Sequence, residues 1–478
     1  MLQSFKKTFV GGRKNHTHAA SHNAGNAGAA AASAASGGAD AVGSPHPPAG
    51  AANPTALVCR VPNEIAQADL SHFAEEAFIQ KLHLCSYLFD FNDPMKNMEG
   101  KEIKRQTLLE LVDYVKSGTG KYNEAVFKGI TRMLEVNLFR PLPSSAHEMS
   151  ESESIDPELK KPTMEAAWPH LQIVYEFLLW YVVSSSETDA DDVAKRYIDQ
   201  EFVLKLLNLF DSEDPRERGY LKTIMHQIYL KFMVHRLFIR EAVNKIFYQF
   251  IKSERHNGIA ELLEFLEDIL KGFVMPVSKE ERKQILERAL VPLHKPKCVS
   301  MYHQQLSYCI TLFVEKDPNL ADSVLLGLLE FWPLSNNQNE LLFLEELEKI
   351  LELTQELEFH LVMTPLFQQI ALCLSSSHFQ VAERTLRLWG NDYIVALVAQ
   401  NHDTILPLIV AALERSAESH QNQAVKELAI NVRMMFLEME EGLYYEYHCQ
   451  FPKEKVNLQL FPKLSSFLPH LAACSGLV

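Results

Sequence analysis

An all-α fold built as a solenoid of paired helices is the fold class that the sequence predicts, and three observations support it. Eight of the 19 glycines lie in the first 50 residues, which leaves eleven for the other 428 and disfavours glycine-rich sheet and barrel folds. From about residue 62 to 447, apolar residues recur at spacings of three and four almost everywhere. Strand alternation is nearly absent over the same range, so no βαβ unit or glycine-rich nucleotide loop can be placed.

The first element, residues 1–56, is predicted to be a disordered tail. Between Gly11 and Ala56 the one aliphatic residue beyond alanine is Val42, and the remainder is small or polar. Such a segment buries too little apolar surface to offset its ordering entropy. Three histidines in the tail have no cysteine or carboxylate beside them, so no metal site is expected there.

Residues 57–447 are predicted to form the solenoid. Two of its apolar stripes are Leu108, Leu111, Val112 and Val115, and Leu221, Ile224, Met225, Ile228 and Phe232. A Ser/Glu-rich stretch interrupts the helices between Pro141 and Pro162 and is expected to be a loop. Residues 448–478 are set apart as a proline-broken C-terminal tail.

Prolines mark the expected helix starts. Asp-Pro pairs at 93–94, 214–215 and 317–318 combine a capping carboxylate with the preset φ of proline, and Glu217 is expected to complete a capping box with Asp214. A second opening signature places Pro292, Pro365 and Pro407 at intervals of 73 and 42 residues. These intervals indicate a helix-pair unit of roughly 40 residues, as in solenoids of HEAT or armadillo type.

Charge and cysteine content restrict the function classes. The formal net charge is −15, and the acidic excess lies outside the first 56 residues, which excludes a general nucleic-acid binder. The longest apolar run, Leu171 to Val183, is shorter than the roughly 20 residues that a bilayer requires, so no membrane association is expected. Seven scattered cysteines without a CxxC pair indicate a reducing compartment, and we expect the protein in cytoplasm and nucleus.

Catalytic motifs of the common enzyme classes are absent from the sequence. No metalloprotease, hydrolase, P-loop or kinase signature occurs, and histidines such as His83, His170 and His360 stand alone in helical segments. The sequence therefore predicts a protein that is not an enzyme, with no cofactor and no metal.

One patch suggests a binding surface. Lys222, His226 and Tyr229 fall at i, i+4 and i+7 on one helical stripe, and Arg236 opens the next helix. Further along the chain come Phe265 and Ile269 at i and i+4, followed by Lys279, Arg282 and Lys283. On adjacent repeats, these residues would form an apolar floor edged by cations, suited to an extended acidic peptide. The alternative is an ordinary solvated face over core residues.

Several stretches resemble the B-prime regulatory subunits of protein phosphatase 2A, which are HEAT-like solenoids. The resemblance covers about residues 57–447 and is carried by Pro162–His170, Ala194–Gln200, Phe210–Arg218, His256–Glu264 and Ser377–Arg384. It implies a non-catalytic regulatory subunit that docks on the scaffold (A) and catalytic (C) subunits of the phosphatase. A transport-receptor-like HEAT scaffold that carries cargo without a phosphatase is the alternative, and co-purification of the phosphatase chains distinguishes the two.

The resemblance also implies a groove on the concave face that binds substrate proteins through short LxxIxE motifs. His226, Tyr229, Phe265 and Ile269 are expected to enclose the peptide's Ile, with Lys222 and Thr223 beside them. Arg236 and Lys279 are expected to meet acidic or phosphorylated peptide residues. The peptide-binding residues carried over are Lys222, Thr223, His226, Gln227, Tyr229, Arg236, Phe265, Ile269, Lys279 and Arg282.

This sequence departs from the family pattern at several positions. Gln227 stands where an Arg near the peptide's Glu is usual, Phe265 replaces a smaller aliphatic residue, and Arg282 replaces a His after a one-residue insertion. Because a neutral amide cannot replace a charge-assisted pair, we expect the motif preference to shift most at the Glu position. Residues 159–161 are Leu-Lys-Lys where relatives have an acidic loop. Contacts near the catalytic subunit are attributed to that acidic loop in the family. Residues 347–352 spell LxxIxE, but their helical pattern predicts a buried structural role.

Overall fold

The computed structural model describes residues 75–118, 122–142, 162–184, 196–272 and 278–450, and these form α-helices, short 3₁₀ helices and one π-helical segment. The predicted tail, residues 1–56, and most of the predicted loop and C-terminal tail lie outside the described residues. The last described helix, α21, ends at Gln450, just beyond the predicted end of the solenoid.

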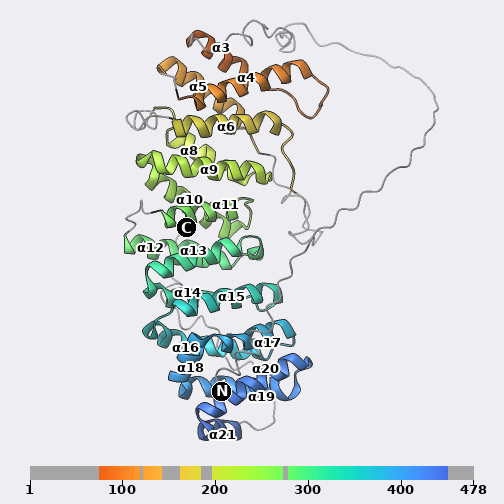
Figure 1. Cartoon of the computed structure of the whole chain (residues 1–478), viewed down its shortest axis with the longest axis vertical. Coiled ribbons are helices and arrows are strands. Elements are labelled where there is room, and N and C mark those ends of the chain that lie inside the picture. The colour runs from red at the N-terminus through yellow and green to blue at the C-terminus, as the bar shows by residue number, and fades with distance from the viewer. Residues whose placement is uncertain (1–74, 119–121, 143–161, 185–195, 273–277, 451–478) are drawn as a thin grey trace, which may run out of the picture. The chain divides into compact units, whose positions relative to one another are not determined.

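The described helices stack in chain order as two layers, and Figure 1 follows them from α3 to α21. The first layer holds α3 (Glu75–Cys85), α5 (Glu124–Leu138), α8 (Gln200–Asn208), α10 (Arg236–Ser253), α12 (Lys279–Ile285), α14 (Ala321–Glu330), α16 (Glu356–Leu374) and α19 (His402–Ser419). The second layer holds α4 (Met98–Lys116), α6 (Trp168–Ser184), α9 (Pro215–Lys231), α11 (Ile259–Lys271), α13 (His303–Lys316), α15 (Asn337–Leu353), α17 (Phe379–Leu386) and α20 (Gln423–Met439). Each helix of the second layer packs against the next helix of that layer, so the layer is continuous.

Shorter elements complete the chain. Two further α-helices are α18 (Asp392–Gln400) and α21 (Glu441–Gln450), and η6 (Leu286–Leu290) is π-helical. The 3₁₀ helices are η4 (Leu209–Asp211), η5 (Met233–His235), η7 (Val291–His294), η8 (Val299–Met301), η9 (Pro318–Leu320) and η10 (Arg387–Gly390).

The repeat period confirms the solenoid prediction. Helices α9, α11, α13, α15, α17 and α20 begin at residues 215, 259, 303, 337, 379 and 423, so successive starts are 44, 44, 34, 42 and 44 residues apart. Both predicted apolar stripes, the one from Leu108 to Val115 and the one from Leu221 to Phe232, are buried. Each residue of the two stripes is at most 1% exposed. Each helix pair therefore buries its apolar face against its neighbours, as the sequence period requires.

The proline signals mark helix starts less often than predicted. Asp214 does cap α9, since its Oδ1 accepts a bond from the Arg216 amide at 2.9 Å. Asp93-Pro94 was wrong as a helix start: Asp93 caps a turn, and α4 begins only after Asn97, whose φ of 55° separates the turn from the helix. Pro365 and Pro407 do not open helices but lie inside α16 and α19. A well-packed apolar helix tolerates an interior proline at the cost of one backbone bond.

The capping box predicted for α9 is also wrong. Glu217 is fully buried and binds Arg140, with two Nη···Oε distances of 2.8 Å, instead of turning back to the helix start. Tyr175 donates to the same carboxylate at 2.6 Å. The amide of Asp214 bonds instead to the Ser212 hydroxyl. Partners 77 and 42 residues away therefore determine where the Glu217 carboxylate points.

Helix α16 is long and apolar enough to cross a membrane by length and composition, and α18 with α19 passes the same test as a pair bent by 110°. More than half of the α16 window, 56%, is buried among the described helices. This degree of burial is typical of a core helix.

Candidate functional site

The candidate site lies along the seam between α9 and α11, two neighbouring helices of the second layer. Its floor is apolar: Tyr229, Phe265 and Ile269 are 2%, 1% and 6% exposed. The Tyr229 and Phe265 rings meet edge to face, with centroids 5.9 Å apart and planes at 84°. The structure thus brings together residues that are 36 or more positions apart in the sequence, as expected from the sequence pattern.

Lys222 and His226 of α9 line this seam, and each lies close to a carboxylate of α11. The Lys222 ammonium lies 2.6 Å from Glu264 Oε2, and His226 Nδ1 lies 3.4 Å from Asp268 Oδ2. Burial raises the pKa of Glu264, but hydrogen bonds from Lys222 and Gln305 outweigh it and hold the pKa below its ordinary value. The sequence pattern identified the cations but not these two carboxylates. Their spacing of four residues on α11, equal to that of Lys222 and His226, was the available signal.

Arg236 has a different environment, at the turn between α9 and α10. Its Nε donates to the Tyr229 carbonyl at 2.8 Å and its Nη2 to the Leu230 carbonyl at 2.9 Å. The guanidinium lies 5.4 Å from the centre of the Tyr229 ring. Among the described residues no carboxylate pairs with Arg236, so its charge is not neutralised by a neighbour. It also satisfies the free carbonyls at the end of α9.

Thr223 and Gln227 lie farther round α9. Thr223 is exposed and donates to the Gly219 carbonyl at 3.1 Å. Gln227 is half-buried and shares the helix face of Tyr220 and Lys231, both of which bond to α6. The structure therefore places Gln227 on the α6 side of α9, while Lys222, His226 and Tyr229 lie on the α11 side.

Helix α12 contributes the remaining candidates. Arg240 of α10 joins it to the floor, because its Nε donates to Glu281 at 2.9 Å and its Nη1 donates to the Tyr229 hydroxyl at 3.4 Å. Lys279 is exposed and forms no ion pair with a described residue. Arg282 is half-buried, and its buried Nε has no hydrogen-bond partner among the described residues. Lys279 and Arg282 are thus cations that can still take an anionic partner.

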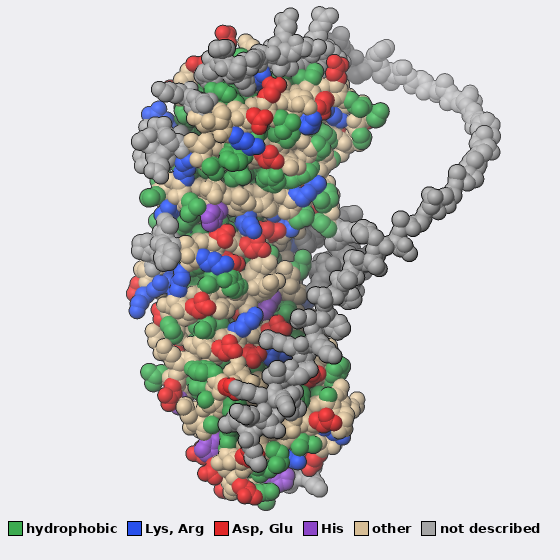
Figure 2. Space-filling view, in the orientation of Figure 1, with side chains coloured by type: hydrophobic (Ala, Val, Ile, Leu, Met, Phe, Trp, Pro, Cys, Tyr) green, Lys and Arg blue, Asp and Glu red, His purple; other side chains and the backbone are tan. Residues whose placement is uncertain are grey.

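The surface as a whole has mixed charge. Figure 2 shows acidic and basic side chains interspersed over the visible face of the described residues. Close ion pairs between α9 and α11 are one cause. The region is therefore a surface of paired charges and not a broad electropositive surface of the kind that attracts nucleic acid.

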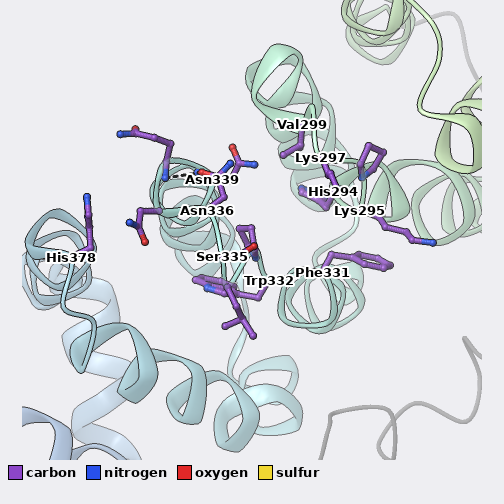
Figure 3. A pocket seen from close by; sticks show the side chains of 15 residues that line it. His294, Lys295, Lys297, Val299, Phe331, Trp332, Ser335, Asn336, Asn339 and His378 are labelled. Atoms are coloured by element: carbon purple, nitrogen blue, oxygen red, sulfur yellow. Dashed lines mark hydrogen bonds between the residues drawn. The ribbon is translucent and has the colours of Figure 1, made fainter. Parts of the chain in front are cut away.

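A cavity of about 950 Å³ lies elsewhere, between loops of three successive repeats (Figure 3). The loops around Lys295, Trp332 and His378 line it, together with several amide side chains. None of its lining residues is acidic, and no nucleophile, base and orienting group converge in it. The cavity does not indicate catalysis.

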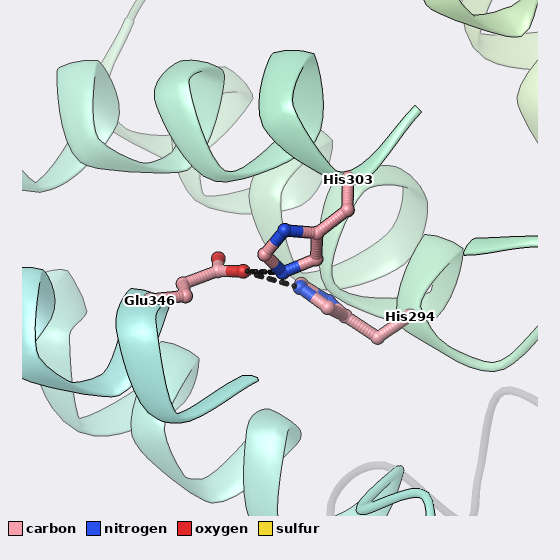
Figure 4. Close-up of side chains that lie close together, drawn as sticks. All are labelled: His294, His303 and Glu346. Carbon is pink, nitrogen blue, oxygen red and sulfur yellow. Dashed lines mark hydrogen bonds and ion pairs between the residues drawn. The ribbon is translucent and has the colours of Figure 1, made fainter. Parts of the chain in front are cut away.

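A buried cluster of His294, His303 and Glu346 is the one group among the described residues with metal-ligand composition (Figure 4). The two imidazole Nε2 atoms lie 3.1 and 2.8 Å from the same oxygen, Glu346 Oε2. The His294 contact is a hydrogen bond, and His294 Nδ1 also lies 2.9 Å from the Val291 carbonyl. His303 Nε2 is close to the carboxylate but forms no hydrogen bond among the described residues. The hydrogen bond between His294 and Glu346 accounts for their short separation, so we treat the cluster as a buried polar contact of the core.

The internal LxxIxE stretch in α15 is also part of the core. Leu347 and Ile350 are fully buried. Its apolar residues therefore pack within the solenoid and are not presented as a ligand, as the helical pattern predicted.

Comparison with known proteins agrees with this architecture. Residues 66–459 match the family described as protein phosphatase 2A regulatory B subunit (B56 family). The B' beta isoform of the 57 kDa regulatory subunit of serine/threonine protein phosphatase 2A from Arabidopsis thaliana is 52% identical over 413 residues, 86% of this chain and 80% of the relative. The B' alpha isoform from the same plant is 54% identical over 382 residues, 80% of this chain and 77% of the relative. The B' kappa isoform of Oryza sativa subsp. japonica is 48% identical over 393 residues, 82% of this chain and 76% of the relative. The chain therefore belongs to the B56 family of protein phosphatase 2A regulatory subunits, a non-catalytic family, as the sequence resemblance implied.

Proposed function

We propose that this regulatory subunit selects substrates for protein phosphatase 2A by binding LxxIxE-type segments along the α9–α11 seam while it docks on the scaffold and catalytic subunits. The observation that carries the proposal is the buried floor of Tyr229, Phe265 and Ile269, bordered by His226 and Arg236. An apolar floor with cations at its edge suits a short segment that carries an aliphatic residue close to a carboxylate.

Each candidate residue has a distinct part in the proposed complex. The peptide's Ile packs on the Tyr229, Phe265 and Ile269 floor, where its burial contributes about 1.5 to 3 kcal/mol. Acidic or phosphorylated side chains approach Arg236 and Lys279, neither of which has a carboxylate partner among the described residues. Lys222, Thr223 and His226 line the side of the groove.

The binding test uses His226→Ala and Arg236→Glu, each with a matched control in another repeat. His360 on α16 and Arg415 on α19 are exposed, so His360→Ala and Arg415→Glu make the same chemical changes away from the seam. We expect the seam variants to lose at least tenfold in affinity for an LxxIxE peptide in calorimetry, and the controls to bind as wild type. Equal binding by seam and control variants with native circular dichroism would mean that the groove lies elsewhere.

The docking part of the proposal has its own test. Scaffold and catalytic subunits should co-purify stoichiometrically with wild type and with His226→Ala alike, because the seam and the phosphatase-binding surface are separate. If neither phosphatase chain co-purifies, a cargo-carrying solenoid without a phosphatase becomes the better account.

A further inference from the structure

Three contacts between basic side chains of α9 and carboxylates of α11 lie in a row along the two helices, and we call them the rungs of a ladder. Both helices belong to the second layer and pack side by side, so residues three or four apart on one helix meet partners three or four apart on the other. The rungs are Arg218–Glu261 at 2.8 Å, Lys222–Glu264 at 2.6 Å and His226–Asp268 at 3.4 Å.

The third rung is the weakest and the most open. At 3.4 Å, the His226 Nδ1 to Asp268 Oδ2 distance exceeds that of a good hydrogen bond. Asp268 has a side chain that is 42% exposed, against 33% for Glu264 and 16% for Glu261. This rung therefore opens at the lowest cost.

Asp268 is also the least anchored of the three carboxylates. Glu264 receives a second bond, from Gln305 Nε2 at 3.2 Å, and Glu261 receives a guanidinium nitrogen at 2.8 Å. Among the described residues, His226 is the one basic side chain that pairs with Asp268. Asp268 lies one residue before Ile269 and one helical turn after Phe265, so its charge stands beside the apolar floor.

We propose that Asp268 is a built-in competitor for the anionic side chains of the bound peptide. In the free protein its carboxylate occupies His226, and a peptide carboxylate or phosphate must displace it or approach against its charge. Asp268 thereby lowers the affinity of the groove for acidic segments and determines how strongly the groove distinguishes peptides by charge. This inference rests on the proposed peptide-binding function of the seam.

The test compares Asp268→Asn with Glu267→Gln in the full-length chain. Both substitutions remove one negative charge from α11. Glu267 pairs with Lys271, whose ammonium lies over the Tyr308 ring of α13, so it faces away from α9. A synthetic LxxIxE peptide and its Glu→Gln derivative serve as probes in calorimetry at low and high salt.

We expect Asp268→Asn to tighten binding of the Glu peptide by about three- to tenfold at low salt, since one nearby like charge is removed. The gain should shrink for the Gln peptide and with added salt. Asp268→Glu should bind as wild type, because it keeps the competing charge. Glu267→Gln should also change little, since its charge lies on the far side of α11.

Three outcomes overturn the inference, and they can be told apart. If wild type binds the Glu peptide but Asp268→Asn leaves the affinity unchanged or weakens it, Asp268 is not a competitor, and the proposed function still stands. If wild type binds neither peptide, the proposed function fails and the inference fails with it. An equal gain in Glu267→Gln would show that only the overall charge of α11 matters, which also contradicts the role of Asp268.

Discussion

Replacing Glu346 by Gln tests the buried polar contact of the core. His294 Nδ1 lies 2.9 Å from the Val291 carbonyl, and its Nε2 lies 3.1 Å from Glu346 Oε2. Glu346 is a fully buried carboxylate held beside two imidazoles. The neutral amide of Gln keeps the shape of this side chain but not its negative charge.

The pKa of Glu346 supplies the magnitude. Burial raises this pKa, but the interactions with His294 and His303 outweigh it and lower the pKa from 4.5 to about 2. Each unit of pKa shift corresponds to about 1.36 kcal/mol, so this difference in pKa corresponds to about 3 kcal/mol in the free energy of unfolding. A carboxylate with a lowered pKa stabilises the fold fully above its unfolded-state pKa, and the contribution is lost as the pH falls from about 4.5 towards 2. Glu346→Gln should thus cost about 3 kcal/mol at pH 7, and the difference from wild type should narrow below pH 4.5.

The measurement must be local, because a solenoid unfolds by neighbouring repeats and not always as one unit. Hydrogen exchange of peptides from η7, α13 and α15 reports the repeats that hold the three residues. Glu345→Gln is the matched control, since Glu345 is exposed and adjacent in the sequence. We expect faster exchange in these helices for Glu346→Gln alone. Equal exchange in both variants would refute the stabilising role of the buried Glu346 carboxylate.

Three further predictions concern other parts of the chain. Gln227→Arg should tighten binding of peptides that keep the Glu of LxxIxE by about ten- to a hundredfold in calorimetry, as expected for a charge-assisted bond worth roughly 1.5 to 3 kcal/mol. Because Gln227 lies on the α6 side, Glu176 can compete for the new Arg side chain. If Gln227→Arg leaves the peptide affinity unchanged but raises it when combined with Glu176→Gln, this competition is the cause. If neither variant changes the affinity, residue 227 does not belong to the Glu pocket. Deleting residues 1–56 should leave the melting temperature and assembly with the phosphatase chains unchanged, since the segment is poor in apolar side chains; a fall of several degrees would contradict this. Glu217→Gln should destabilise the protein by about 1 to 3 kcal/mol in urea unfolding, because it removes the fully buried carboxylate that binds Arg140 and leaves that guanidinium with Glu165 alone, and a change below about 0.5 kcal/mol would contradict that role.

The solenoid could be predicted from the sequence because its determinants are local. A stripe such as Leu108, Leu111, Val112 and Val115 specifies both a helix and its buried face within eight residues, and all four are at most 1% exposed. The spacing of prolines predicted the repeat period, although two of these prolines, Pro365 and Pro407, lie inside helices and do not open them. Their spacing was informative because equivalent positions of a repeat recur, whatever the position does locally.

Contacts between distant residues account for the errors. Glu217 had the right spacing for a capping box, but the guanidinium of Arg140 and the hydroxyl of Tyr175 bind its carboxylate more strongly than one backbone amide does. Nothing within α9 reveals either partner. In the same way, periodicity placed Lys222 and His226 on one stripe, whereas the pairing with Glu264 and Asp268 depends on how α9 and α11 align.

The graded ladder suggests how one surface can be both stable and able to bind. Arg218 and Glu261, at 14% and 16% exposure, are the least exposed pair and hold the two helices together near the start of each helix. Two turns along α9, His226 and Asp268 are 28% and 42% exposed and sit beside a floor that is already packed. In the proposed complex, a peptide exchanges this exposed contact for its own, while the two inner pairs keep the spacing of α9 and α11. The carboxylates of α11 would then hold the basic side chains of α9 until an anionic peptide side chain replaces Asp268.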